Sequence, residues 1–101
     1  MDMQVKKDGR CLEIYLKGEL DHHGAKGLMS QLDREIEPTM PLQLVLDFGG
    51  ITFMDSSGIA VVMRAKQRLS AWGGTAKLRN VPPQPKKVLN AAAISRWMEM
   101  E

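Results

Sequence analysis

The sequence has few of the residues on which several common classes of protein depend. Among its 101 residues there is one cysteine, so a scaffold stapled by internal disulfides is excluded. Aromatic residues make up only 5%, which leaves little with which to build a base-stacking platform for nucleic acid. The net charge of +2 is also too small to indicate nucleic-acid binding.

Signals for membranes and secretion are missing as well. No apolar run reaches the length of a membrane span, and residues 1–9 lack the apolar stretch of a signal peptide. We therefore expect a cytoplasmic protein with no membrane partner. Because Cys11 sits in a stretch of alternating apolar residues, we expect it to be a buried thiol in a reducing compartment.

The motifs of common enzymes and cofactor sites are absent too. The sequence contains neither a G-x-S-x-G elbow nor a phosphate-binding G-x-x-x-x-G-K-[ST] loop. His22 and His23 are the only histidines, and adjacent residues project in different directions, so they make a poor metal site. We expect no catalytic residues, no metal and no cofactor, and we assign both histidines to a helix start or a partner surface.

What is present favours one globular domain. Apolar residues make up 44% of the chain, enough for a core, and the length suits a single domain spanning residues 1–101. Charge is uneven along the chain. Residues 1–50 carry six Lys or Arg against nine Asp or Glu, and residues 51–101 carry eight against three. This asymmetry is compatible either with an acidic and a basic face or with ordinary charged helix surfaces.

Two periodicities predict the secondary structure. Period-two alternation and short apolar runs predict strands at 3–6, 11–17, 42–48 and 75–81, with a possible last strand within 95–100. Apolar residues three and four apart predict helices near 22–37, 57–72 and 84–92. Asp21 is a plausible N-cap of the first helix, Pro38 is expected to stop that helix near Glu37, and Gly73-Gly74 to end the second.

This order of elements predicts an α/β fold. Two early strands followed by alternating strands and helices indicate a four- or five-stranded mixed sheet with helices mainly on one face. Leu44, Leu46 and Phe48 are expected on the central strand. Three of the eight methionines, Met29, Met54 and Met63, are expected to fill irregular gaps in the core.

The segment Asp55-Ser56-Ser57-Gly58 stands where a strand passes into a helix. One interpretation is structural: one residue caps the helix, the others fill the turn, and Gly58 relieves crowding. The other is functional, because a phosphate on a serine at a helix N-terminus changes the surface a partner meets without unfolding the domain. We expect the Ser56 hydroxyl to face solvent and Ser57 to act as the cap. A serine nucleophile needs a base within reach, and His22 and His23 are the only histidines that could serve. Because the G-x-S-x-G elbow is absent as well, we disfavour a serine hydrolase.

Two arginines on the second helix extend this region. Arg64 and Arg68 are four residues apart and away from the apolar side of the helix, so they are neighbours on its outer face. We expect them either to solvate the helix or to make a contact at the rim of a partner interface.

Two motifs then resemble those of a known family. Residues 18–23 (GELDHH) and 53–59 (FMDSSGI) are similar to motifs of the STAS-domain anti-sigma-factor antagonists, and Gly73-Gly74 falls at that family's helix end. The similarity covers essentially the whole chain and is greatest to the sporulation members that act in the sigma-F system. One departure is Ala92-Ala93-Ile94, where the family often has a Ser-Gly-Leu turn.

The resemblance implies a switch rather than an enzyme. In such proteins the unphosphorylated form binds an anti-sigma factor that is also a serine kinase, and sigma is released. Phosphorylation of the serine after the aspartate, Ser56 here, with Ser57 as the alternative, ends that binding. A PP2C-type phosphatase reverses it. The protein is expected to be a monomer. The expected partner-binding residues are Asp21, His22, His23, Asp55, Ser56, Ser57, Gly58 and Arg64.

One other reading of the same fold stays open. A STAS-type sensor of a ligand or nucleotide would have no kinase partner. The presence of an acceptor serine favours the phosphorylation switch over the sensor.

Overall fold

Strands and helices alternate along the chain as the two periodicities predict. The computed structural model describes residues 1–101. In chain order the elements are β1 (Asp2–Asp8), β2 (Cys11–Leu20), α1 (His22–Thr39), β3 (Gln43–Met54), α2 (Ser57–Ser70), β4 (Thr75–Arg79), α3 (Pro83–Ala91), a 3₁₀ turn (Ile94–Arg96) and β5 (Glu99–Met100). None of these helices combines the length and the apolar content that crossing a bilayer requires.

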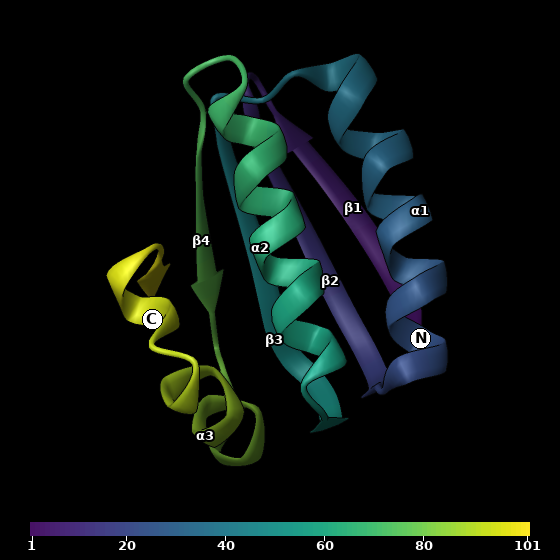
Figure 1. The fold of residues 1–101 in the computed structure, drawn as a ribbon. Helices are drawn as coiled ribbons and strands as arrows, with labels where there is room; N and C mark the ends of the chain where they lie inside the picture. The colour runs from purple at the N-terminus through teal and green to yellow at the C-terminus, as the bar shows by residue number, and fades with distance from the viewer.

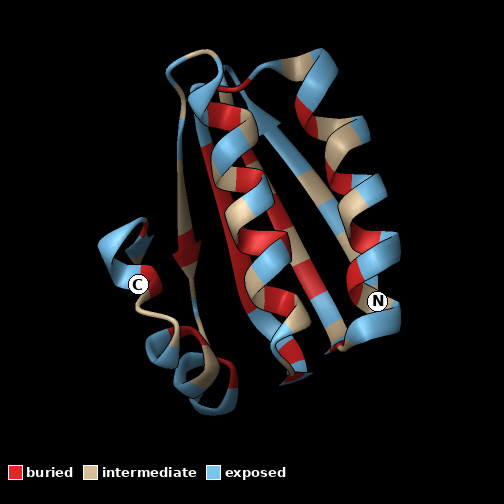
Figure 2. Cartoon of the chain, viewed as in Figure 1, coloured by how far each residue is buried: buried red, intermediate tan, exposed pale blue.

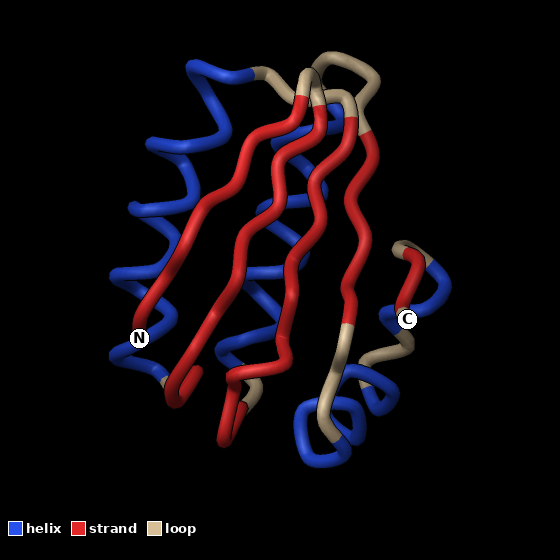
Figure 3. The backbone as a smooth tube through the Cα atoms, turned by 180° about the vertical axis from the view of Figure 1, so that it is seen from behind, coloured by secondary structure: helices blue, strands red, loops and turns tan.

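The sheet is mixed and five-stranded, with its strands in sequential order from β1 to β5. β1 runs antiparallel to β2, and every other neighbouring pair is parallel. α1 and α2 lie side by side across one face, while α3 sits beyond the end of β4 (Figure 1). Seen from behind, the opposite face of the sheet carries no helix (Figure 3). The predicted fold class and the central position of β3 are therefore confirmed.

The core lies between the sheet and the two covering helices, where buried residues face one another (Figure 2). Leu44, Leu46 and Phe48 of β3 are fully buried. Against them pack the apolar stripes of the helices, Ala25, Leu28, Leu32 and Ile36 from α1 and Val61, Val62, Ala65 and Leu69 from α2. Of the three methionines expected in the core, Met54 is fully buried, and Met29 and Met63 pack partly buried against its edge.

The open face of the sheet is held by polar contacts. Asp47 is 7% exposed and accepts hydrogen bonds from the Arg79 guanidinium at 3.1 Å and the Asn80 amide at 2.9 Å. Arg79 also pairs with Glu13 at 3.1 Å and donates to the Tyr15 hydroxyl at 3.1 Å. Burial opposes ionisation of Asp47, but its hydrogen bonds outweigh that effect and hold its pKa below the ordinary value. This network ties β2, β3 and β4 together without a covering helix.

The central strand is longer than predicted. β3 continues from Phe48 through Gly49-Gly50 to Met54, although glycine is a poor strand former. The reason is tertiary, because β2 runs beside this extension up to the Leu20–Met54 pair. A Cβ on Gly50 would lie 2.7 Å from the carbonyl oxygen of Leu16, so only glycine lets β2 approach there.

The end of α1 also differs from the prediction. Pro38 does not stop the helix near Glu37, since α1 continues to Thr39 with Pro38 inside it. Pro38 has no N–H to donate to the Arg34 carbonyl, but it falls in the last turn, so this loss affects only the end of the helix. The helix then closes at Met40, whose left-handed conformation (φ 44°) brings its N–H to the Ile36 carbonyl at 2.9 Å.

Three smaller expectations need correction. Cys11 is partly exposed rather than buried, because it shares the open face with Glu13 and Tyr15 while Leu12 faces the helices. The last strand is only Glu99–Met100, because Ile94–Arg96 first forms a 3₁₀ turn. The expected strand 75–81 likewise ends early, at Arg79. Ala93, at the Ala-for-Gly departure, adopts a left-handed φ of 54° that glycine would adopt without strain.

Candidate functional site

Two loops meet at the carboxyl edge of the sheet because β2 and β3 end side by side. Leu20 pairs with Met54 in the parallel register, and the Asp55 N–H donates to the Leu20 carbonyl at 3.2 Å. Asp21 follows the first of these strand ends and Asp55 the second. The fold thus brings together the two motifs at 18–23 and 53–59, which are separated by 29 residues in the sequence.

The first loop starts α1. The Asp21 carboxylate accepts a hydrogen bond from the Gly24 N–H at 2.8 Å, which confirms the predicted N-cap. That hydrogen bond is the main reason why the pKa of Asp21 lies below its ordinary value. His22 and His23 are the first two residues of the helix, both exposed, with ring centroids 6.1 Å apart.

The second loop starts α2 in a different way. Ser56 occupies the N-cap position, yet its side chain makes no capping hydrogen bond and the residue is exposed. The Asp55 carboxylate instead accepts from the Ser57 N–H at 2.8 Å. The expectation that Ser57 caps α2 is wrong, because Ser57 is already the first helical residue and Asp55 satisfies its N–H. The Ser56 hydroxyl is left free.

Gly58 lies directly behind this turn and is buried. A Cβ there would lie 2.6 Å from the Met54 side chain and 3.1 Å from Leu20 Cδ2. The start of α2 is therefore packed tightly onto the ends of β2 and β3, which fixes where the free hydroxyl stands.

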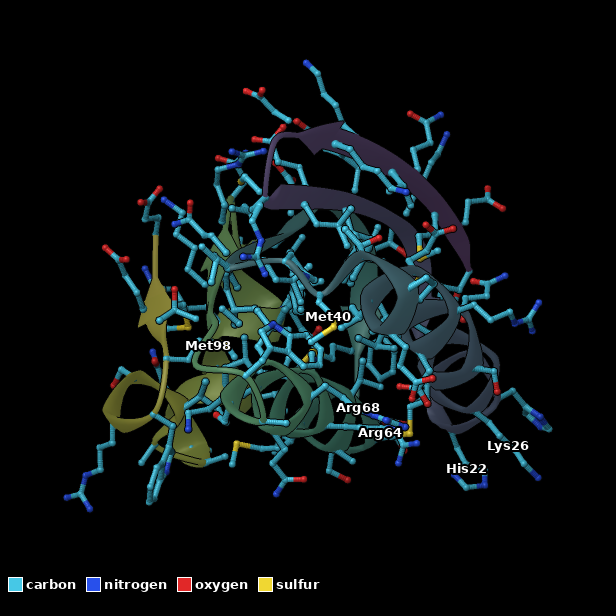
Figure 4. All side chains as sticks on the ribbon, turned by 90° about the horizontal axis from the view of Figure 1, so that it is seen from above. His22, Lys26, Met40, Arg64, Arg68 and Met98 are labelled. Carbon is cyan, nitrogen blue, oxygen red and sulfur yellow. The ribbon has the colours of Figure 1, made fainter.

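The two serines line different grooves on either side of α2. The α1–α2 groove includes Ser57 and is lined by His22, Ala25, Lys26, Met29, Ser57 and Ala60. The α2–α3 groove includes Ser56 and is lined by Ser56, Ile59, Lys87, Val88, Ala91 and Ala92. Figure 4 shows His22 and Lys26 projecting together from the start of α1. Both grooves carry cationic or ionisable side chains beside mainly apolar walls.

The two arginines of α2 are not free on its outer face, contrary to expectation. Arg64 pairs with Asp33 of α1 at 2.8 Å, and Arg68 pairs with Asp33 at 3.1 Å and with Glu37. Figure 4 shows both arginines together between the two helices. The hydrogen bond from Arg64 is the main cause of the lowered pKa of Asp33. Periodicity could not reveal this, because the partners lie on another helix.

Three residues near the loops were missed by the sequence analysis. Phe53, next to the buried Met54, is 44% exposed at the end of β3. Lys87 lines the groove beside Ser56. Gln84 of α3 makes two hydrogen bonds to the main chain of Met54, at 2.9 Å and 2.8 Å. The positive charge of the second half of the chain was a signal for Lys87, whereas nothing in the local sequence signals Gln84.

Comparison with known proteins identifies the family. The family profile described as "STAS domain" matches residues 2–101. The chain belongs to the STAS family. Two curated relatives of this STAS domain are each named "Anti-sigma F factor antagonist". The one from Lysinibacillus sphaericus is 32% identical over 84% of this chain and 73% of its own length. The one from Paenibacillus polymyxa is 28% identical over 97% of this chain and 86% of its own length.

Two solved structures that match this chain show SpoIIAA with and without phosphorylation. SpoIIAA in its unphosphorylated form, an anti-sigma factor antagonist, matches this STAS domain with a TM-score of 0.84. SpoIIAA from Bacillus in the phosphorylated form matches with a TM-score of 0.75. Both are 28% identical and cover 99% of this chain, and the chain covers 88% and 91% of theirs.

Proposed function

We propose that this STAS domain is an anti-sigma-factor antagonist that is switched off by phosphorylation of Ser56. Unphosphorylated, it binds an anti-sigma factor that is also a serine kinase, so that sigma is released. A PP2C-type phosphatase restores the active form. It acts as a cytoplasmic monomer, binds neither nucleic acid nor membrane, and has no enzymatic activity of its own. The names of its relatives and the two states of SpoIIAA support this proposal.

One observation carries the choice of residue. Ser56 stands at the cap position of α2, exposed, with a hydroxyl that makes no hydrogen bond within the protein. Ser57 is half-buried in the first turn and lines the other groove. A kinase must reach the hydroxyl from solvent, and of the two serines Ser56 meets this condition better.

The surroundings of Ser56 explain how phosphorylation would end binding. Asp21 and Asp55 already bring two carboxylates to this edge of the sheet, with Lys87 in the groove beside Ser56, and a phosphate adds a charge of about −1.5 to −2. A partner group that accepts a hydrogen bond from the hydroxyl would then face a like charge. A hundredfold loss of affinity needs only about 2.7 kcal/mol, within reach of one desolvated charge clash.

The domain itself tolerates the phosphate for a separate reason. The positive end of the helix dipole at the start of α2 favours an anion there, even though the N–H groups of Ser57, Gly58 and Ile59 already donate to Asp55 and Ser56. The proposed contact surface therefore changes its charge while its shape is kept. It comprises Asp21, His22, His23, Asp55, Ser56, Ser57 and Arg64, the last because 46% of its side chain is exposed beside its ion pair. The buried Gly58 contributes by supporting the turn from behind.

The test is phosphosite mapping by mass spectrometry after incubation with the cognate anti-sigma factor and ATP. We expect one phosphate on Ser56, none on the Ser56→Ala variant, and normal modification of the matched Ser57→Ala variant. Phosphate on Ser57 alone would make the assignment wrong. An absence of phosphate on any serine, together with binding of a nucleotide or small ligand, would favour a STAS-type sensor instead.

A further inference from the structure

β3 ends without a strand on one side. β4 pairs with β3 only from Gln43 to Asp47, because β4 ends at Arg79 and the chain then turns away from the sheet. Beyond that point β2 still pairs with β3, up to Met54. Along a strand, successive residues direct their N–H and C=O groups to opposite sides. Asp55 directs its N–H toward Leu20 of β2, so the main-chain groups of Met54 face the side that β4 has left.

The carboxamide of Gln84 fills that place. Its Oε1 accepts a hydrogen bond from the Met54 N–H at 2.9 Å, and its Nε2 donates to the Met54 carbonyl at 2.8 Å. One side chain thus supplies the donor and the acceptor that a neighbouring strand would otherwise provide. Removing this amide would leave the Met54 N–H and carbonyl without these partners. Because Met54 is fully buried, water would not readily replace them.

The backbone of α3 holds Gln84 in position for this contact. Gln84 is the second residue of α3 and lies between Pro83 and Pro85, both of which have a restricted φ. Pro85 is buried, and the Lys86 N–H closes the first turn on the Pro82 carbonyl at 2.9 Å. Although Gln84 as a residue is exposed, its Cα is fixed and its carboxamide turns in to the strand end.

We propose that Gln84 is a positioning residue that holds the end of β3 and thereby presents the Ser56 hydroxyl to its partners. Met54 is followed directly by Asp55, whose carboxylate caps Ser57, with Ser56 between them. The inference rests on the proposed function of Ser56. Without the Gln84 contact the turn samples more conformations, and apparent affinity falls by the fraction of time that it spends in the competent one.

Hydrogen exchange measured by NMR tests the contact directly and needs no partner. Gln84→Met keeps the length of the side chain and removes both hydrogen bonds. We expect it to raise exchange at the amides of Met54 and Ser57 about tenfold, with the amides of β1 and β2 unchanged. Gln84→Glu keeps the acceptor but not the donor when ionised and is expected to lie between. Gln31→Met, at an exposed position of α1, is the matched control.

Phosphorylation kinetics separate positioning from simple anchoring of α3. We expect Gln84→Met to raise the KM for phosphorylation by the cognate kinase about fivefold and to leave kcat within twofold. Unchanged exchange at Met54, equally faster exchange throughout the sheet, or faster exchange with an unchanged KM would each overturn the proposal. If the wild-type protein is never phosphorylated, the proposed function fails, and an unchanged Met54 amide would still overturn the contact independently.

Discussion

α1 and α2, which both begin at the carboxyl edge of the sheet, have opposite arrangements at their first turns. α1 uses its own N-cap residue, because the Asp21 carboxylate holds the Gly24 N–H. α2 uses the residue before its N-cap, because Asp55 holds the Ser57 N–H. The Ser56 side chain, at the N-cap position of α2, is therefore not needed to cap the helix. A modifiable serine can stand there without its hydroxyl being needed for the fold.

The largest effect should follow from adding charge at the free cap. We expect Ser56→Asp to weaken binding to the anti-sigma factor about a hundredfold, which is about 2.7 kcal/mol, because the new carboxylate stands beside Asp21 and Asp55. Ser56→Ala is expected to bind within about threefold of wild type. Titration calorimetry measures both. If Ser56→Asp bound normally at an unchanged melting temperature, the cap position of α2 would not be a site where charge controls binding.

The glycines behind each cap sharpen the comparison next. A Cβ at Gly24 would lie 2.7 Å from the Glu19 carbonyl oxygen, whereas one at Gly58 would meet the Met54 side chain at 2.6 Å. Main chain yields less readily than a flexible methionine. We expect Gly24→Ala to cost about 2 to 3 kcal/mol and Gly58→Ala about 1 kcal/mol in unfolding free energy. Urea denaturation measures the two values, and the reverse order would contradict this reading.

Removing each cap side chain should separate stability from binding. We expect Asp21→Ala to lower the melting temperature by about 5 °C, because the Gly24 N–H loses its acceptor. Ser56→Ala is expected to change it by about 1 °C or less, since its hydroxyl bonds to nothing. Differential scanning calorimetry compares them. A similar loss in both variants would mean that Ser56 also caps its helix.

The smallest effect concerns pH. The pKa of Asp21 is lowered in the folded state from an ordinary value of 3.8, chiefly by the Gly24 N–H. Its ionised form therefore adds stability that is present above pH 3.8 and is lost as the pH falls through the lowered value. Asp21→Asn keeps a capping oxygen without the charge. We expect the difference in melting temperature between wild type and Asp21→Asn to shrink below that pH, and a constant gap would contradict the assignment.

Much of this architecture could be predicted from local pattern. The alternation in β2 and the apolar stripe of α1 follow from periods of two and 3.6 residues. The place of Asp55 and Ser56 between a strand and a helix follows equally, because capping residues and a glycine interrupt the apolar pattern. The predictions were wrong at the end of α1, near Pro38, and at the start of α2, near Ser57. At both places local preferences allow several helix boundaries, and contacts with the surrounding backbone determine which one forms.

The sequence by itself determined the order of elements, the buried faces and the two motifs, because these depend on neighbours along the chain. Only the tertiary structure decided which groups meet across it. Arg64 turned out to pair with Asp33, and Gln84 to hold Met54, at separations of about thirty residues. Such contacts are set by how strands register and helices pack, and one side chain's own preferences carry no information about a partner so distant in sequence.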